Sequence, residues 1–407
     1  MERSGRVLSI DVLRGADVWL MLFVNEMAGV RQTPAFLLHK PPSADGLTIT
    51  DVVFPAFLFI TGMAIPLALG GRLRRGEPRA VVWRHVLART AALLVIGVLM
   101  VNTERASETG ILPAPLWTLL MTVAVVLLWM TPEGASRPRA RRAWQAAGLV
   151  VLAAIVFMYR ADGGSGLVQL RPSWWGILGL IGWAYLVAAA AYLLAGDRPA
   201  VLTGLVALLF LVALADEADA LGALVAARPL VHVGRSLASH GALALSGAVL
   251  TLALLRHRRE GAPPERFVAP ALAYAAALGA AGLLLHALHD VHPAFWISKV
   301  RATAAWCLLS AALTVLAWAV AYALADVRGW RRWPATVTMA GENALVAYLL
   351  APFLLAVFAV LGWLLGWNPY HAASGSLPLG LLRAVVFSWA VIRLAGWMHA
   401  RGLRLRL

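Results

Sequence analysis

Residues 6–62, RVLSIDVLRGADVWLMLFVNEMAGVRQTPAFLLHKPPSADGLTITDVVFPAFLFITG, hold two apolar segments that carry polar side chains. The first segment, residues 8–30, contains Asp11, Arg14, Asp17, Asn25 and Glu26. At about 100° per residue on a helix, Asp11, Arg14 and Asn25 fall on a stripe roughly 60° wide. Ionisable groups inside a membrane helix are costly and usually face a polar cavity, so we expect this stripe to serve a function.

The second apolar segment, residues 48–69, places four residues on one helical face by the same count: Asp51, Pro55, Leu58 and Gly62. The loop between the two segments contains His39. We expect the stripe of the first segment and this face of the second to form opposite walls of a substrate path. Plainer roles stay open, because Asp11 and Arg14 also suit an ion pair within one helix. Asp51 also suits a helix cap beside Thr48.

The composition places the chain in a membrane. It has 407 residues, of which 61% are hydrophobic and 14% charged, and its mean hydropathy is +0.77. A soluble domain of this length could not bury so much apolar surface, so we expect an all-α polytopic membrane protein. The net charge of +15 indicates cytoplasmic loops in such a protein, and we expect no nucleic acid partner. The single cysteine, Cys307, excludes an internal disulfide.

The apolar pattern predicts about 10–12 transmembrane helices, and the short segment at 199–215 also suits a re-entrant helix. The predicted segments lie near residues 8–30, 48–70, 81–102, 112–130, 143–159, 173–195, 199–215, 236–255, 268–288, 302–325, 337–365 and 377–399.

Arginines are concentrated in alternate connections between these segments. They occupy residues 72–79, 137–142, 198, 256–266, 328–332 and 401–406. Cytoplasmic loops carry an excess of basic residues, so this set is expected inside the cell. Both chain termini are then cytoplasmic, and the loop with His39 lies outside.

The opening of the chain also carries a recognisable motif. It runs Arg6-x-x-Ser9-x-Asp11-x-x-Arg14-Gly15, Val24-Asn25, a loop histidine, and Gly46-Leu47-Thr48-x-x-Asp51-Val52-Val53-Phe54-Pro55. This pattern resembles the heparan-α-glucosaminide N-acetyltransferase family, its bacterial relatives with a domain of unknown function and the broader transmembrane acyltransferases. Later stretches that resemble the family are the block 173–185, Ile297-Ser298-Lys299, and a closing element with Gly341-Glu342-Asn343 and Tyr348. The resemblance implies a single transmembrane acyltransferase domain over residues 1–407, with motif-bearing helices at 6–70 and a closing element at 297–350.

The resemblance implies that His39 is the catalytic residue and that Asn25 lies close to the active site. Histidine suits this role because its pKa near 6.5 lets it accept a proton at working pH. We add Asp51 as a third catalytic candidate, and Asp45 and Lys299 as substrate-binding candidates. Arginine clusters suit the phosphates of coenzyme A, so we expect acetyl-CoA as co-substrate. The candidate donor-binding residues are Arg6, Asp11, Arg14, Arg72, Arg75, Arg331, Arg332 and Asn343. We expect no metal site, although His286, His289 and His292 lie close together in the sequence.

The sequence therefore predicts an acetyltransferase of the bacterial cytoplasmic membrane that moves an acetyl group from cytosolic acetyl-CoA to an extracytoplasmic acceptor, an amino sugar or another glycan. Its expected partners are the lipid bilayer, coenzyme A and that acceptor, and a homodimer stays open. Two other classes stay open as well. A transporter or flippase would also need polar groups inside helices. A lipid-linked glycosyltransferase needs a carboxylate in an early outer loop, where Asp45 is available. N- versus O-acetylation, and an acetyl-histidine versus a ternary complex, are not decided by the sequence.

Overall fold

The computed structural model describes residues 7–107, 110–131, 138–161, 164, 166–174, 176–228, 230–330, 335–405 and 407. Helices account for most of this part of the chain. The α-helices are α1 (Leu8–Met27), α2 (Ile49–Arg74), α3 (Arg79–Thr103), α4 (Ala114–Trp129), α5 (Pro138–Met158), α6 (Ile177–Ala195), α7 (Pro199–Glu217), α8 (His240–Arg259), α9 (Val268–His286), α10 (Ala304–Tyr322), α11 (Ala335–Glu342), α12 (Ala344–Leu365), α13 (Pro369–Ala372) and α14 (Leu377–Ala400). Two-residue strands, β1 (Met130–Thr131) and β2 (Arg404–Leu405), form one antiparallel pair.

The helix lengths confirm an all-α polytopic membrane protein. Among the described residues, ten helices are long and apolar enough to cross a membrane. Helix α7 is one of them, and its length favours a full span over the re-entrant alternative for residues 199–215. Helix α1 has 20 residues but carries four acidic or basic side chains, and α4 is apolar but shorter. With α1 and α4 included, every predicted segment overlaps one of these helices.

One predicted segment, residues 337–365, is interrupted. Helix α11 ends at Glu342 and α12 begins at Ala344, with Asn343 between them in a non-helical conformation. The Asn343 amide donates to the backbone carbonyls of Ala395 (3.2 Å) and Leu403 (3.2 Å). Asparagine competes for backbone hydrogen bonds in this way, and the apolar pattern alone did not reveal the break.

The described chain forms two compact units, each assembled from segments far apart in the sequence. The first unit comprises Met1–Asp17, Ala35–Ala91 and Leu180–Pro334, and the second comprises Val18–Pro34, Ala92–Gly179 and Ala335–Leu407. The prediction of a single acyltransferase domain stays a prediction.

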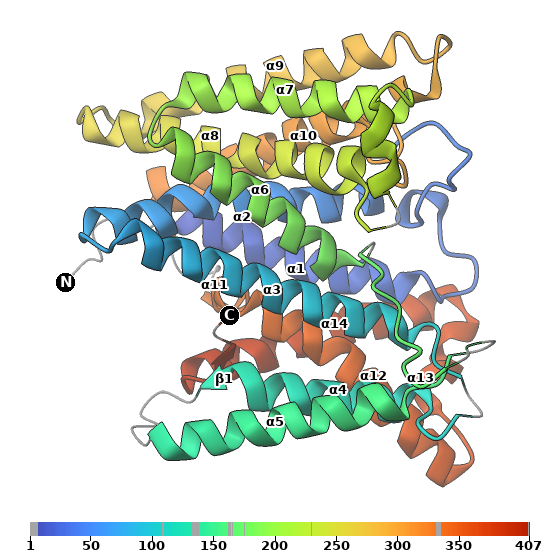
Figure 1. Ribbon diagram of the computed structural model, residues 1–407. Helices are drawn as coiled ribbons and strands as arrows, with labels where there is room; N and C mark the ends of the chain where they lie inside the picture. Colours follow the sequence, from blue (N-terminus) through green and yellow to red (C-terminus); the bar gives the residue numbers. More distant parts are fainter. Residues whose placement is uncertain are drawn as a thin grey trace. The chain divides into compact units, whose positions relative to one another are not determined.

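In the first unit, α2, α8, α9 and α10 pack together, and α7 packs on α8 (Figure 1). Polar contacts join the loops at each end of these helices. At one end, the Arg259 guanidinium donates to Asp197 between α6 and α7 (2.9 Å), and the Tyr322 hydroxyl donates to the Pro264 carbonyl (3.2 Å). At the other end, the backbone N–H of Gly46 donates to the carbonyl of Ile297 (3.0 Å). The unit thus has a basic end, where the arginine-rich connections meet, and a second end that contains His39, which we call the His39 end.

Close backbone contact holds α2 against α8. A Cβ atom on Gly62 of α2 would overlap the carbonyl of Ala244, and one on Gly247 of α8 would overlap the carbonyl of Phe59. Small residues allow such an approach between membrane helices. The expectation that the Asp51–Gly62 face is an open wall of a path is therefore wrong at Gly62, because α8 covers it there.

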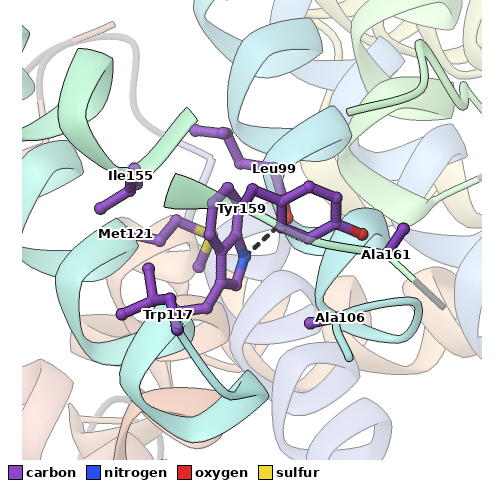
Figure 2. Close-up of a cluster of buried hydrophobic side chains, with 8 residues drawn as sticks. Leu99, Ala106, Trp117, Met121, Ile155, Tyr159 and Ala161 are labelled. Carbon is purple, nitrogen blue, oxygen red and sulfur yellow. Dashed lines mark hydrogen bonds between the residues drawn. The ribbon is translucent and has the colours of Figure 1, made fainter. Parts of the chain in front are cut away.

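In the second unit, aromatic side chains join α3, α4 and the end of α5. Figure 2 shows Trp117 lying against Tyr159, with ring centroids 4.8 Å apart. The Trp117 indole donates to the carbonyl of Leu99 (3.3 Å), and the Tyr159 hydroxyl donates to the carbonyl of Asn102 (2.8 Å). The polar atoms of both buried aromatic side chains are thus satisfied by backbone carbonyls of one helix.

We predict that Gly62→Ala lowers the thermal midpoint of the protein purified in detergent, because the added methyl group forces α2 away from α8. Overpacking in a filled interior costs about 1–3 kcal/mol or more. The matched control is Gly204→Ala in α7, where a Cβ atom meets nothing within 4 Å. Its midpoint should stay the same or rise, because alanine favours helix over glycine. Equal midpoints for the two variants would contradict the close α2–α8 contact.

Candidate functional site

Asp51 lies in the first turn of α2 and is 1% exposed. Its carboxylate accepts backbone N–H groups from Lys40 (3.2 Å) and Thr48 (3.3 Å). Thr48 caps the helix, and its hydroxyl accepts the Asp51 N–H (3.3 Å), which completes a capping box. Asp51 therefore does take part in capping the helix, as the sequence allowed. The capping contacts use one carboxylate oxygen, Oδ2, and leave Oδ1 for another partner.

The other carboxylate oxygen of Asp51 faces His39, with 2.8 Å between Oδ1 and Nδ1 of the imidazole. A carboxylate only accepts hydrogen bonds, so the proton of the neutral imidazole belongs on Nδ1. The lone pair then lies on Nε2. The imidazole itself is 46% exposed, so a substrate can reach it. A buried carboxylate that orients a histidine in this way is the arrangement found in general-base catalysis.

Lys299 completes the cluster from a loop more than two hundred residues away in the sequence. Its Nζ lies 3.0 Å from Nε2 and 3.1 Å from Nδ1 of His39. Burial lowers the pKa of Lys299 to about 8, while the charge of Asp51 acts in the opposite direction. Unlike arginine, which stays charged, this amine can lose its proton close to neutral pH.

Asp45 holds the Lys299 loop in place. Its Oδ1 accepts the backbone N–H of Ile297 at 2.8 Å, and the neighbouring Gly46 donates to the carbonyl of the same residue. The loop then turns through Ala302, which has a positive φ of 50°, into the Thr303 cap of α10. The structure thus brings together His39, Asp51, Asp45 and Lys299, all within the first unit.

Trp306 also contributes, and the sequence analysis missed it. Its indole N–H donates to the backbone carbonyl of Asp51 (3.2 Å). In a regular helix this carbonyl would accept the N–H of residue 55, but that residue is Pro55, which has none. The proline was a usable signal that the Asp51 carbonyl needs a partner. Nothing in the sequence indicates that the partner is on α10.

The candidate donor-binding residues of the first unit lie toward its basic end. Arg14 contacts Asp11 at 3.3 Å in α1, so this pair does form an ion pair. Arg72 and Arg75 lie at the carboxyl end of α2 and contact Glu77 at 2.9 and 3.4 Å. At the usual rise of about 1.5 Å per residue, Arg72 lies about 32 Å along α2 from Asp51. These arginines are therefore not part of the cluster around His39.

The structure does not assign the other residues predicted for catalysis or donor binding to the cluster around His39. Asn25 belongs to the second unit and is exposed, and Asn343 holds the carboxyl-terminal segment, as described above. Arg6, Arg331 and Arg332 lie outside the described residues. The roles proposed for all of these residues stay predictions.

The histidines at the end of α9 and in the loop that follows do not converge on one point. The rings of His286 and His289 are 4.9 Å apart at their centroids, and His292 caps a short turn through the N–H of Ala294. Within the described part of the chain, no group of three or more His, Cys, Asp or Glu side chains is arranged to hold a metal ion.

We predict that Lys299 reacts with an amine-specific reagent at half its maximal rate near pH 8. Burial favours the neutral amine, so it becomes reactive well below the pH at which an ordinary lysine does, about 10.4. The chain has only one other lysine, Lys40, so peptide mass spectrometry separates the two sites directly. A half-maximal rate near pH 10 at Lys299 would contradict the burial of its amine.

Two comparisons relate the chain to known proteins. A family model described as "Domain of unknown function (DUF5009)" matches residues 6–224, a segment that contains His39 and Asp51. The heparan-alpha-glucosaminide N-acetyltransferase of Mus musculus is 35% identical over 99 residues, and that of Homo sapiens is 36% identical over 97 residues. Each match covers 24% of this chain but only 14% of the relative, so the chain shares a limited segment with these enzymes. Because the family model spans more than half of its residues, the chain belongs to the DUF5009 family, and a segment of it resembles heparan-α-glucosaminide N-acetyltransferase.

Proposed function

We propose that the protein is a membrane acetyltransferase that takes an acetyl group from acetyl-CoA and transfers it to an amine or hydroxyl of an amino sugar or another glycan. The observation that carries this proposal is the cluster at the His39 end: an exposed imidazole held by a buried carboxylate at 2.8 Å, with an amine at 3.0 Å from Nε2. The partial similarity to an N-acetyltransferase supports the choice of acyl group.

In the proposed reaction, Nε2 of His39 acts on the acceptor. It accepts the proton of the acceptor amine or hydroxyl while the acceptor oxygen or nitrogen attacks the thioester carbonyl. Asp51 stabilises the imidazolium that forms, because it accepts the Nδ1–H throughout. The proton then passes to the departing thiolate, and the site returns to its starting state. A second route, in which Nε2 first takes the acetyl group itself, uses the same geometry.

Lys299 is proposed to stabilise negative charge. As an ammonium it lies within 3.1 Å of the imidazole, close to where the thioester oxygen would gain charge during attack. Asp45 and the segment at Ile297 position this amine. In this assignment Lys299 lies beside the reacting atoms and Asp45 is a positioning residue, and substrate binding by either one stays a prediction.

We propose that the donor approaches from the basic end. Arg72 and Arg75 lie at that end of α2, and arginine suits phosphate groups. Because these residues are about 32 Å from Asp51 along the helix, they are proposed to line the entrance for the donor. By the positive-inside rule the basic end faces the cytoplasm of a bacterial cell, both termini are cytoplasmic, and His39 faces outward.

His39→Ala should lower the turnover number by a factor on the order of 10² or more, the usual scale for loss of general acid–base catalysis. Asp51→Asn should lower it comparably, because the amide cannot stabilise the imidazolium. The measurement is acetyl transfer from acetyl-CoA to a panel of amino sugars, read by mass spectrometry with purified protein. The control is His371→Ala, at an exposed histidine in the short helix α13 of the second unit, which should retain full activity. If His39→Ala keeps more than a tenth of the activity, the assignment fails.

Cysteines at the two ends should be labelled from opposite faces of the membrane. His39→Cys and Arg198→Cys place exposed thiols at the His39 end and the basic end of the first unit, while the native Cys307 is fully buried and stays silent. An impermeant maleimide applied to intact cells should label position 39 and not position 198. In inverted vesicles the pattern should reverse. Labelling of both positions from one face would reject the proposed topology.

A further inference from the structure

A second cluster of charged side chains lies at the His39 end, after α7. Asp216, at the end of α7, is 1% exposed and organises the following loop. Its carboxylate accepts the Arg228 guanidinium (3.0 and 3.2 Å) and the backbone N–H of Gly234 (2.9 Å), and His232 lies 2.9 Å away. These contacts use both oxygens of Asp216. The carboxylate is therefore fully engaged by its own loop.

Glu217, the next residue, is engaged as well. It forms an ion pair with Arg301 at 3.0 Å. Arg301 belongs to the same loop as Lys299, and its backbone N–H donates to the Ser298 hydroxyl at 3.4 Å. This ion pair therefore links the loop beside His39 to the end of α7. This loop thus carries two basic side chains, Lys299 and Arg301, just before the start of α10.

Arg235 has no partner in this cluster. It lies in the π-helical turn Val233–Ser239 that leads into α8, and its side chain is half-buried. Its Nε is buried without a hydrogen bond, and across the described residues no carboxylate lies within ion-pair distance of its guanidinium. The charges that act on it are Glu217 and Asp216, which are already paired, and the cations Arg301 and Arg228. An arginine in such surroundings has lost water without gaining a counter-ion, which is costly.

His240 provides a second, independent observation. It is 2% exposed, and its Nδ1 has no hydrogen-bond partner within the described structure. Its backbone N–H donates to the backbone carbonyl of Arg235 in the π-helical turn. The ring lies edge-on to Phe54 (5.5 Å) and Trp306 (6.3 Å), and Trp306 donates to Asp51. His240 thus connects the turn that carries Arg235 to the packed layer of the proposed catalytic pair.

We propose that Arg235 binds an oxyanion of the acceptor, a carboxylate or a phosphate, and so selects acceptors that carry a negative group near the acetylated position. A guanidinium recognises both anions with paired N–H donors. Bound oxyanion would supply the counter-charge that the side chains around Arg235 do not. The proposal deepens the proposed function, since it rests on an acceptor that reaches His39. Binding at Arg235 can nevertheless be measured without any turnover.

The experiment measures the thermal midpoint of the full chain in a neutral detergent. The probes are sodium glucuronate and inorganic phosphate, compared with glucose and with sodium chloride at equal ionic strength. We expect at least one anion to raise the wild-type midpoint by a few degrees beyond both controls, since a ligand that binds only the folded state stabilises it. A response to glucuronate assigns a carboxylate, and a response to phosphate assigns a phosphate.

Arg235→Met should abolish this rise. Without an anion, its midpoint should equal or exceed that of the wild type, because the change removes a half-buried cation whose Nε has no hydrogen-bond partner. Arg198→Met, the same change at an exposed arginine of the basic end, should keep the rise. His39→Ala should also keep it, so a failure of the acetyl-transfer proposal would be seen separately. The inference is overturned if neither anion acts beyond the controls, if Arg235→Met retains the rise, or if Arg235→Met alone lowers the midpoint.

Discussion

The proposed site depends on the hydrogen bonds that the buried carboxylate of Asp51 accepts. An ionised carboxyl group that is 1% exposed needs several donors to offset the loss of water. Here the donors are the backbone of Lys40, the cap at Thr48 and the imidazole of His39. Removing one partner from such a group typically costs about 1–3 kcal/mol. The same contacts that satisfy the charge therefore fold the loop over the end of α2 and orient the catalytic candidate.

The helices around α2 keep this carboxylate in place. Gly62 and Gly247 bring the backbones of α2 and α8 into contact, and Trp306 of α10 donates to the carbonyl that Pro55 leaves without a partner. Asp45 holds the loop that carries Lys299. Helix α10 and two loops thus converge on the first turn of α2, and α8 packs on the same helix about three turns farther along. A chemically active loop positioned by a rigid scaffold is a common arrangement in enzymes.

The sequence predicted much of the fold, because apolar segments of membrane length are a strong signal. It missed the break at Asn343, since hydrogen bonds to the distant Ala395 and Leu403 cause it. In the site, the motif that contains His39 and Asp51 was visible in the sequence, but the contact between these residues, twelve positions apart, was not predicted. The pairing of Trp306 with Asp51, and the lack of a partner for Arg235, depend on elements far apart in the sequence. No local pattern encodes them.

In the proposed function, one site receives the acetyl group from the basic end and delivers it at the His39 end. The most direct measurement uses the purified protein in sealed vesicles of known orientation, with labelled acetyl-CoA supplied on one side and amino-sugar acceptor on the other. We expect labelled product only when the donor is on the side of the basic end and the acceptor is on the side of His39. Equal product with donor and acceptor exchanged, or acceptor movement across the membrane without release of free coenzyme A, would contradict it.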